Sequence, residues 1–277
     1  MLRSAKALRD GNEEGFILIV ALLAVAGLSL IAVDLSTRSS GFAQIASIES
    51  GLIEAGFASD AGLAKALAAL SDDTDPYWAQ SMASEAGMAW QFDRATVRLR
   101  IQAESGKVDL MVGEIELIDG VVKALVADAT VRSDIMQRVK QVRNTQTPPR
   151  TISAILPPSL RITPLASRFG ECLTVFSGQA SVDPLSATPL VRKLLIGQRT
   201  DLDEAMAQSV RIGRITPDLA AGLGSRLVVQ RPLYTVEVEA RIANGIVSRQ
   251  AALVLLAPGQ APEILRRFDF APSQETF

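Results

Sequence analysis

The stretch FILIVALLAVAGLSLIAV, Phe16–Val33, decides how the rest of the chain is organised. It contains 18 residues without a charge and lies between Glu14 and Asp34. At about 1.5 Å per residue, a helix of this length spans roughly 27 Å, which is close to the ~30 Å hydrocarbon thickness of a bilayer. Because only a helix satisfies its own backbone groups in lipid, the stretch predicts a transmembrane helix.

The composition argues against several kinds of chemistry. The chain has 277 residues, 48% of them hydrophobic, and a net charge of −2, so it has no basic excess that would favour nucleic-acid binding. It contains no histidine, which excludes Ser-His-Asp and Cys-His sites and the commonest zinc ligand. The single cysteine, Cys172, cannot form an internal disulfide, and we interpret it as a small residue on a buried strand. The sequence therefore predicts no enzyme activity.

The residues before the apolar stretch, MLRSAKALRDGNEEG at positions 1–15, indicate its orientation. They carry Arg3, Lys6 and Arg9, and basic residues beside a membrane helix favour the cytoplasmic side. A secretory signal peptide also begins in this way, but its apolar core is usually about 7–15 residues long. Ordinary signal cleavage and a plain uncleaved anchor both stay open as interpretations.

After Asp34 the helical pattern continues without a proline to about Leu70, so a helix over 16–70 would be roughly 80 Å long. The segment SDDTDP, Ser71–Pro76, predicts its end. Asp73 and Asp75 are weak candidates for calcium ligands, because the glycine and distal glutamate of a calcium loop are missing. We favour a helix-terminating turn for this segment.

Apolar and polar residues then alternate in two regions, as in half-buried strands. The first is Thr96–Gln102, followed by a turn over 104–107 and a returning segment, Val108–Val112. The second is Tyr234–Ala240, which Asn244-Gly245 joins to Ile246–Leu256 through a predicted type I′ hairpin turn.

Between these regions the sequence predicts mainly helices, which indicates a helical insertion into a sheet domain. Leu173–Phe176 reads as a strand, and Asp201 and Asp203 fit N-capping of the helix beside them. The predicted helical segments are Ile115–Ala127, Val131–Val142, Ile152–Leu156, Pro164–Phe169, Pro189–Ile196, Leu202–Ser209 and Pro217–Leu223.

The junction Glu14-Gly15-Phe16 resembles the class III leader of type IV prepilins and pseudopilins. This resemblance implies cleavage by prepilin peptidase after Gly15 and N-methylation of the new first residue, Phe16. Most members carry a glutamate at the fifth mature position, which is Val20 here. The minor pseudopilin K of type II secretion lacks that glutamate and is proposed to lie at the pseudopilus tip. A carboxylate in lipid is costly unless it pairs with a charged group of a neighbouring subunit. A subunit at the tip has no neighbour above it whose N-terminus such a carboxylate could neutralise, so valine costs less there than glutamate.

Two further segments resemble the minor pseudopilin K (general secretion pathway protein K) family. IQAESGKVDL, Ile101–Leu110, is similar to its Glu-Ser-Gly-Lys-hydrophobic-Asn/Asp segment. LTVFSGQASVDPLSA, Leu173–Ala187, is similar to its "LTV…VN-x-NTA" stretch, with Asp183-Pro184 where the family has Asn-Thr. The resemblance implies a helical domain with SAM-like or helix-hairpin-helix character inserted into a pilin-like sheet. Calcium is implied as possible, since some members bind it, although no acidic loop here matches a ligand set.

The predicted fold is therefore α+β and pilin-like, with a long N-terminal membrane helix packed on an antiparallel sheet and an inserted all-α domain. The predicted parts are a leader at 1–15, a transmembrane and spine helix at 16–70, a pilin-like domain at 71–112 and 171–257, a helical insertion at 113–170, and a loose tail at 258–277.

The predicted function is that of a minor pseudopilin that initiates or caps the type II secretion pseudopilus. The resemblance implies the minor pseudopilins I and J, other pseudopilus subunits and prepilin peptidase as partners, with the N-terminus cytoplasmic and the C-terminal domain periplasmic at the inner membrane. A minor pilin of a type IV pilus or DNA-uptake system is the alternative. A periplasmic hydrolase using Glu237 and Glu239 was weighed against a solvated sheet surface, which we favour.

Overall fold

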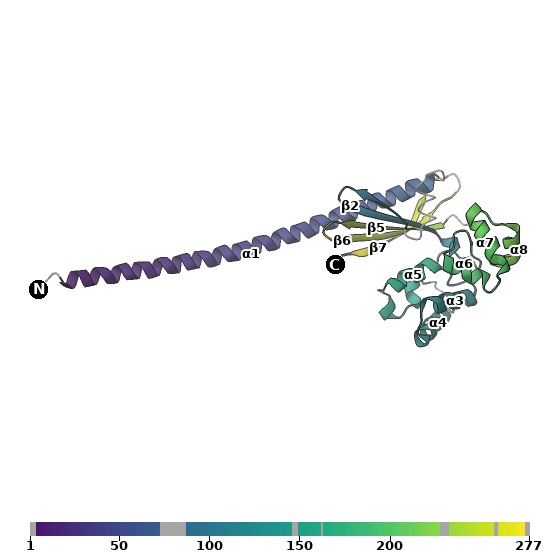
Figure 1. Ribbon diagram of the computed structural model, residues 1–277, viewed down its shortest axis with the longest axis horizontal. Helices are drawn as coiled ribbons and strands as arrows, with labels where there is room; N and C mark the ends of the chain where they lie inside the picture. The colour runs from purple at the N-terminus through teal and green to yellow at the C-terminus, as the bar shows by residue number, and fades with distance from the viewer. Residues whose placement is uncertain are drawn as a thin grey trace. The chain divides into compact units, whose positions relative to one another are not determined.

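The computed structural model describes residues 4–72, 87–145, 149–161, 163–227, 233–257 and 260–274. The chain divides into two compact units, Met1–Glu54 and Ala55–Phe277. All described residues of the first unit belong to one helix, α1, which runs from Ser4 to Ser71 (Figure 1). The helix ends where the sequence predicts, and it begins within the predicted leader, well before Phe16.

A five-stranded antiparallel sheet in the order β1-β2-β5-β6-β7 forms one half of the second unit (Figure 1). Both predicted alternating regions are strands of this sheet, with every second side chain of β2 and β5 buried. The strands are β1 Met88–Phe92, β2 Ala95–Ala103, β5 Leu233–Ile242, β6 Ile246–Leu255 and β7 Glu263–Gln274.

Neither edge strand of the sheet, β1 or β7, was predicted from the sequence. The prediction of a loose tail after residue 258 is wrong for Glu263–Gln274, because this segment pairs with β6 along its length. Its sequence, EILRRFDFAPSQ, alternates over only a few residues and contains Pro272, which is tolerated on an edge strand. The opposite edge, β1, was not predicted at all, since MAWQF buries only Met88 fully.

The hairpin between β5 and β6 is present, but its turn is not type I′. That type needs a positive φ at both central residues. Gly245 has φ 82°, but Asn244 does not have a positive φ, because Asp93 is the only non-glycine residue of the described part that does. The Gly245 amide donates to the Ile242 carbonyl at 3.0 Å. The loop is therefore a three-residue connection in which Gly245 alone takes the left-handed conformation.

The last turns of α1, from Ala55 onward, pack on one face of the sheet through small residues. Ala55, Ala58, Gly62 and Ala66 are all buried. A Cβ at Gly62 would lie 2.5 Å from Cγ1 of Val238 on β5 and 3.0 Å from Cγ1 of Val97 on β2. The helix lies this close to the sheet because position 62 has no side chain.

The helical half of the second unit has its own hydrophobic core, with members from Val108 to Leu223. The predicted helices are confirmed, and Pro189–Ile196 and Pro217–Leu223 match to the residue. The helices are α3 Ile115–Leu125, α4 Ala129–Arg143, α5 Pro164–Cys172, α6 Pro189–Ile196, α7 Asp201–Ile212 and α8 Pro217–Leu223, with short 3₁₀ turns η1 Glu104–Gly106, η2 Ile152–Ile155, η3 Pro158–Leu160 and η4 Gly224–Arg226 (Figure 1).

This core extends beyond both ends of the predicted 113–170 insertion, because it includes Val108 and Leu110 before it and residues of α6, α7 and α8 after it. The domain limits themselves stay a prediction. The N-cap prediction at α7 is wrong: Thr200 occupies the cap position, and Asp201 and Asp203 lie in the first turn.

The returning segment Val108–Val112 does not pair back onto β2. Its first two residues form β3, Val108–Asp109, which pairs in parallel with β4, Leu173–Thr174, in a separate two-stranded sheet. The predicted strand Leu173–Phe176 is thus only two residues long. The α+β class, the long helix on an antiparallel sheet and the helices inserted between its strands are confirmed.

Replacing Gly62 with alanine should destabilise the second unit by about 1–2 kcal/mol, since the clash with β-branched Val238 and Val97 outweighs the gain in helix propensity. Gly56→Ala is the matched control, because a Cβ there meets nothing within 4 Å. That change should be neutral or stabilise by up to ~1 kcal/mol. Denaturant unfolding of the full chain in detergent micelles measures both. Equal effects of the two variants would contradict the close helix–sheet contact.

Candidate membrane anchor and buried polar junction

The apolar segment of α1 has the properties of a membrane span. Among the described residues, Phe16–Ser71 is the one helix long and apolar enough to cross a membrane, with a mean hydropathy of 3.0 in its most apolar window. None of that window is buried. Large apolar side chains point outward all round the helix, from Phe16 at 69% exposed to Val33 at 62%. A helix that is apolar on every face requires an apolar surrounding.

One polar side chain interrupts the segment Phe16–Val33, and the helix itself satisfies it. The Ser29 hydroxyl donates to the carbonyl of Val25 at 2.8 Å. Such a bond removes the cost of placing a hydroxyl in hydrocarbon. The segment therefore presents only apolar groups to whatever surrounds it.

The residues predicted for processing all lie on α1. Gly15 and Phe16 are in its helical backbone, and Val20, at the position of the missing pilin glutamate, is 48% exposed. Their predicted roles in cleavage and methylation stay predictions. Asp73 and Asp75, the weak metal candidates, lie outside the described residues. Within the described ranges no group of three or more metal-ligating side chains is arranged to hold an ion.

A second candidate site was not predicted from the sequence, namely a buried polar junction between the sheet and the helical half. Its centre is the Glu104 carboxylate, which is 1% exposed. One of its oxygens accepts from Lys107 Nζ at 2.5 Å and from the Thr235 hydroxyl of β5 at 2.5 Å. The other accepts from the Thr174 hydroxyl of β4. One carboxylate thus joins three segments that are far apart in the sequence.

Asp109 extends the same junction. One of its carboxylate oxygens accepts from the backbone amides of Met111 and Val112, at 2.8 and 3.2 Å. The other accepts from the Ser177 hydroxyl at 2.9 Å and the Gly178 amide at 2.8 Å. The two segments with family-like sequences, Ile101–Leu110 and Leu173–Ala187, are therefore bonded to each other.

Asp183 stands where the resemblance leads us to expect asparagine, and it has a local structural role. Its carboxylate accepts from the Leu185 amide at 3.0 Å and the Ser186 hydroxyl at 2.7 Å. Its own amide donates to the Ser105 carbonyl at 2.8 Å. Asp183 thus closes the turn before α6 and connects that turn to the Glu104 segment.

Arg100 supports the junction from the same face of the sheet as Thr235, because Gln102 pairs with Thr235 and Arg100 with Glu237. Its guanidinium lies 2.7 Å from a Glu171 oxygen of α5 and 3.0 Å from a Glu237 oxygen of β5. Burial lowers the pKa of Arg100, but the carboxylates of Glu237 and Glu171 outweigh that effect and raise the pKa overall. Gln102 adds a bond from its side-chain amide to the Glu171 carbonyl at 2.7 Å.

The two carboxylates weighed as a hydrolytic pair are both engaged in ion pairs. Glu237 is bound to Arg100, and Glu239 lies 2.8 Å from Arg249 and 3.6 Å from Arg241. This arrangement fits the solvated sheet surface favoured above.

Cys172 is buried, at 4% exposed, but it is the last residue of α5 and does not lie on a strand as predicted. Its thiol lies 3.6 Å from the Thr188 hydroxyl. Burial raises the pKa of the Cys172 thiol and so disfavours the nucleophilic thiolate.

Comparison with known proteins gives a limited result. No protein-family model matches the chain, and no curated protein matches it. Among solved structures, a chain of the GspK-GspI-GspJ complex of the type 2 secretion system of enterotoxigenic Escherichia coli aligns with 85% of this chain and 99% of its own length. The TM-score is 0.47 and the identity 11%, so the likeness is too low to carry an argument.

Replacing Lys107 with methionine should destabilise the fold by about 3 kcal/mol, because the Glu104 charge stays buried without its cation. The double variant Glu104→Gln/Lys107→Met removes that charge and should recover at least half of the loss. Lys123→Met breaks an ion pair of equal length, 2.5 Å, on the surface, where Lys123 is 65% exposed. It should cost under ~1 kcal/mol. Urea unfolding measures all three, and equal costs for Lys107→Met and Lys123→Met would refute the buried junction.

Cys172 should react with N-ethylmaleimide only after the protein unfolds, because the thiol is buried and its pKa is raised. It is the only cysteine in the sequence, so mass spectrometry of the intact chain reports its labelling directly. Labelling in native buffer at pH 7 should be at least ~100-fold slower than in urea. Similar rates in both conditions would contradict this packing.

Proposed function

We propose that this chain is a membrane-anchored structural subunit, a minor pseudopilin of the K type in a type II secretion system. The observation that carries the proposal is the N-terminal helix, which is apolar on every face over Phe16–Val33 and, from Ala55, packs on an antiparallel sheet. A helix with these two parts anchors a domain to a membrane without any reactive group. The prepilin-like junction at Gly15-Phe16 supports the assignment to the pilin superfamily.

Prepilin peptidase removes the charged leader after Gly15, and the new N-terminus, Phe16, is methylated. The basic leader favours a cytoplasmic N-terminus, so the domain from Ala55 onward lies in the periplasm, with the apolar segment in the inner membrane. Val20 supports a tip position, because it does not require a neighbouring subunit to neutralise a carboxylate in lipid.

The chain acts by assembly. Its partners are the minor pseudopilins I and J, as the resemblance of the leader and of segments 101–110 and 173–187 to the K family implies. Packing of the apolar helix against theirs initiates the pseudopilus, and the helical half prevents a further subunit from adding above it. No catalytic role is included, since Glu237 and Glu239 are engaged in ion pairs and Cys172 is buried.

Mass spectrometry of the mature N-terminus tests the proposal. In cells with prepilin peptidase the protein should begin at Phe16 and carry one added methyl group, and in cells without the peptidase it should keep its leader. Gly15→Ala should leave the leader attached, whereas Gly11→Ala changes a glycine away from the junction and should be processed normally.

A mature chain that begins at Met1 in both cell types, or downstream of Val33, would refute the pseudopilin assignment. Deletion of the gene then separates the two pilin-type functions. Loss of secretion of folded proteins with intact pili supports the type II system, and loss of pili or DNA uptake with intact secretion refutes it.

A further inference from the structure

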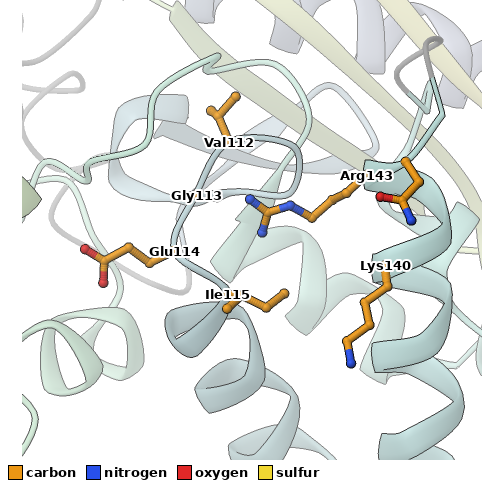
Figure 2. A pocket seen from close by; sticks show the side chains of 7 residues that line it. Val112, Gly113, Glu114, Ile115, Lys140 and Arg143 are labelled. Atoms are coloured by element: carbon orange, nitrogen blue, oxygen red, sulfur yellow. The ribbon is translucent and has the colours of Figure 1, made fainter.

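The helical half carries an open hollow of about 610 Å³ that none of the roles above uses (Figure 2). It lies where the segment leading into α3 faces the last turn of α4. Figure 2 shows the Arg143 side chain extending from α4 toward Gly113, with Lys140 on the preceding turn of the same helix. The lining residues are Val112, Gly113, Glu114, Ile115, Lys140, Arg143 and Asn144.

The two cations of the hollow form no ion pair within the part of the chain that the structure describes. Nη1 of Arg143 is buried and has no hydrogen-bond partner among the described residues. The one acidic lining residue, Glu114, is held by Arg226 at 2.9 and 3.1 Å. Figure 2 shows its carboxylate directed away from the two cations.

The surrounding sequence adds to this positive charge. Residues 129–170 contain seven basic side chains and one acidic one, in a chain whose net charge is −2. Three of the basic side chains have internal roles: Arg132 binds carbonyls at the end of α3, Arg138 binds Asp134, and Arg161 binds the Leu156 carbonyl. Lys140 and Arg143 have no such role, and they alone of the seven line the hollow.

The N-terminus of α3 adds to the positive potential of the hollow. Its cap residue, Glu114, makes no side-chain bond to the first-turn amides, and Ile115 at the helix start lines the hollow. The positive end of a helix favours an anion nearby. The rim also carries apolar groups, Val112 and Ile115, which suit a side chain with an apolar stem better than a bare inorganic ion.

We infer that this hollow binds an acidic peptide segment of a partner protein, with one carboxylate on Arg143 and a second on Lys140. The planar guanidinium of arginine matches a carboxylate with two parallel hydrogen bonds, and lysine adds a point charge. The volume exceeds the need of a single carboxylate and suits two neighbouring acidic side chains. The site does not depend on the membrane role proposed above, so each can fail separately.

Fluorescence anisotropy with the full chain in uncharged detergent micelles tests the site. The probe is a fluorescein-labelled peptide with four consecutive glutamates, and its matched control carries four glutamines. Lys140→Gln/Arg143→Gln should weaken binding of the glutamate peptide at least ~10-fold, or about 1.4 kcal/mol. Arg150→Gln/Arg168→Gln removes the same charge from the same basic segment outside the hollow and should change binding less than about twofold.

The inference would be overturned by equal loss in the two double variants, by equal binding of the glutamine peptide, or by no binding of the glutamate peptide at millimolar concentration. Competition separates carboxylate from phosphate. Glutarate should displace the peptide at a lower concentration than inorganic phosphate does, and the reverse order would refute a carboxylate site. Should the double variant unfold by circular dichroism, Lys140→Gln alone, which changes an exposed side chain, should still weaken binding at least threefold.

Discussion

The close approach of α1 to the sheet is the contact on which the second unit depends. A helix and a sheet normally pack about 10 Å apart, because side chains fill the space between them. Here Ala55, Ala58, Gly62 and Ala66 leave little to fill, so Val97 and Val238 fit directly against the helix backbone. The larger side chains of Leu63 and Leu70, which lie seven residues apart and so on the same side of the helix, are buried as well. The two strand residues nearest Gly62, Val97 and Val238, are β-branched, and their stiff side chains help to hold the contact in one register.

The buried carboxylates attach the helical half, which has its own hydrophobic core, to the sheet. An apolar contact between the two halves would tolerate sliding, whereas Glu104 and Asp109 each require particular donors at fixed positions. Glu104 binds β5 through Thr235 and β4 through Thr174, and Asp109 binds the loop at Ser177 and Gly178. Because a buried charge without its partners is costly, these bonds allow only one arrangement of the joined segments.

Local signals in the sequence predict much of this fold, and pairing between distant segments explains what they miss. α6 and α8 were predicted to the residue because each begins at a Thr-Pro pair whose threonine caps the helix, and each ends at a glycine with positive φ. β2 and β5 were predicted because one face is apolar. By contrast, β3 and β4 are two residues long and exist only because they pair with each other, while β7 is an edge strand with weak alternation.

The candidate sites also differ in whether a local sequence signal or contact between distant segments defines them. The apolar stretch Phe16–Val33 could be recognised directly, because its property belongs to each residue separately. The polar junction could not, since Glu104 and Asp109 look like surface residues of a turn until Thr174, Ser177 and Thr235 lie beside them. Even so, the family-like segments around 104–109 and 173–187 were the correct place to look, because their polar residues bond to each other.

The distribution of polar groups indicates how this chain acts. In the described residues, Glu104 and Asp109 are buried and bonded, Glu237 and Glu239 are neutralised by arginines, and the Cys172 thiol is covered. Two exposed features stand apart from these engaged groups: the apolar surface of Phe16–Val33, and the hollow lined by Lys140 and Arg143. Both surfaces are suited to binding through complementarity, the first to an apolar surrounding and the second to an anion. An apolar surface and a charged hollow both suit contacts with other molecules, and this supports the proposed role as a subunit that acts by assembly.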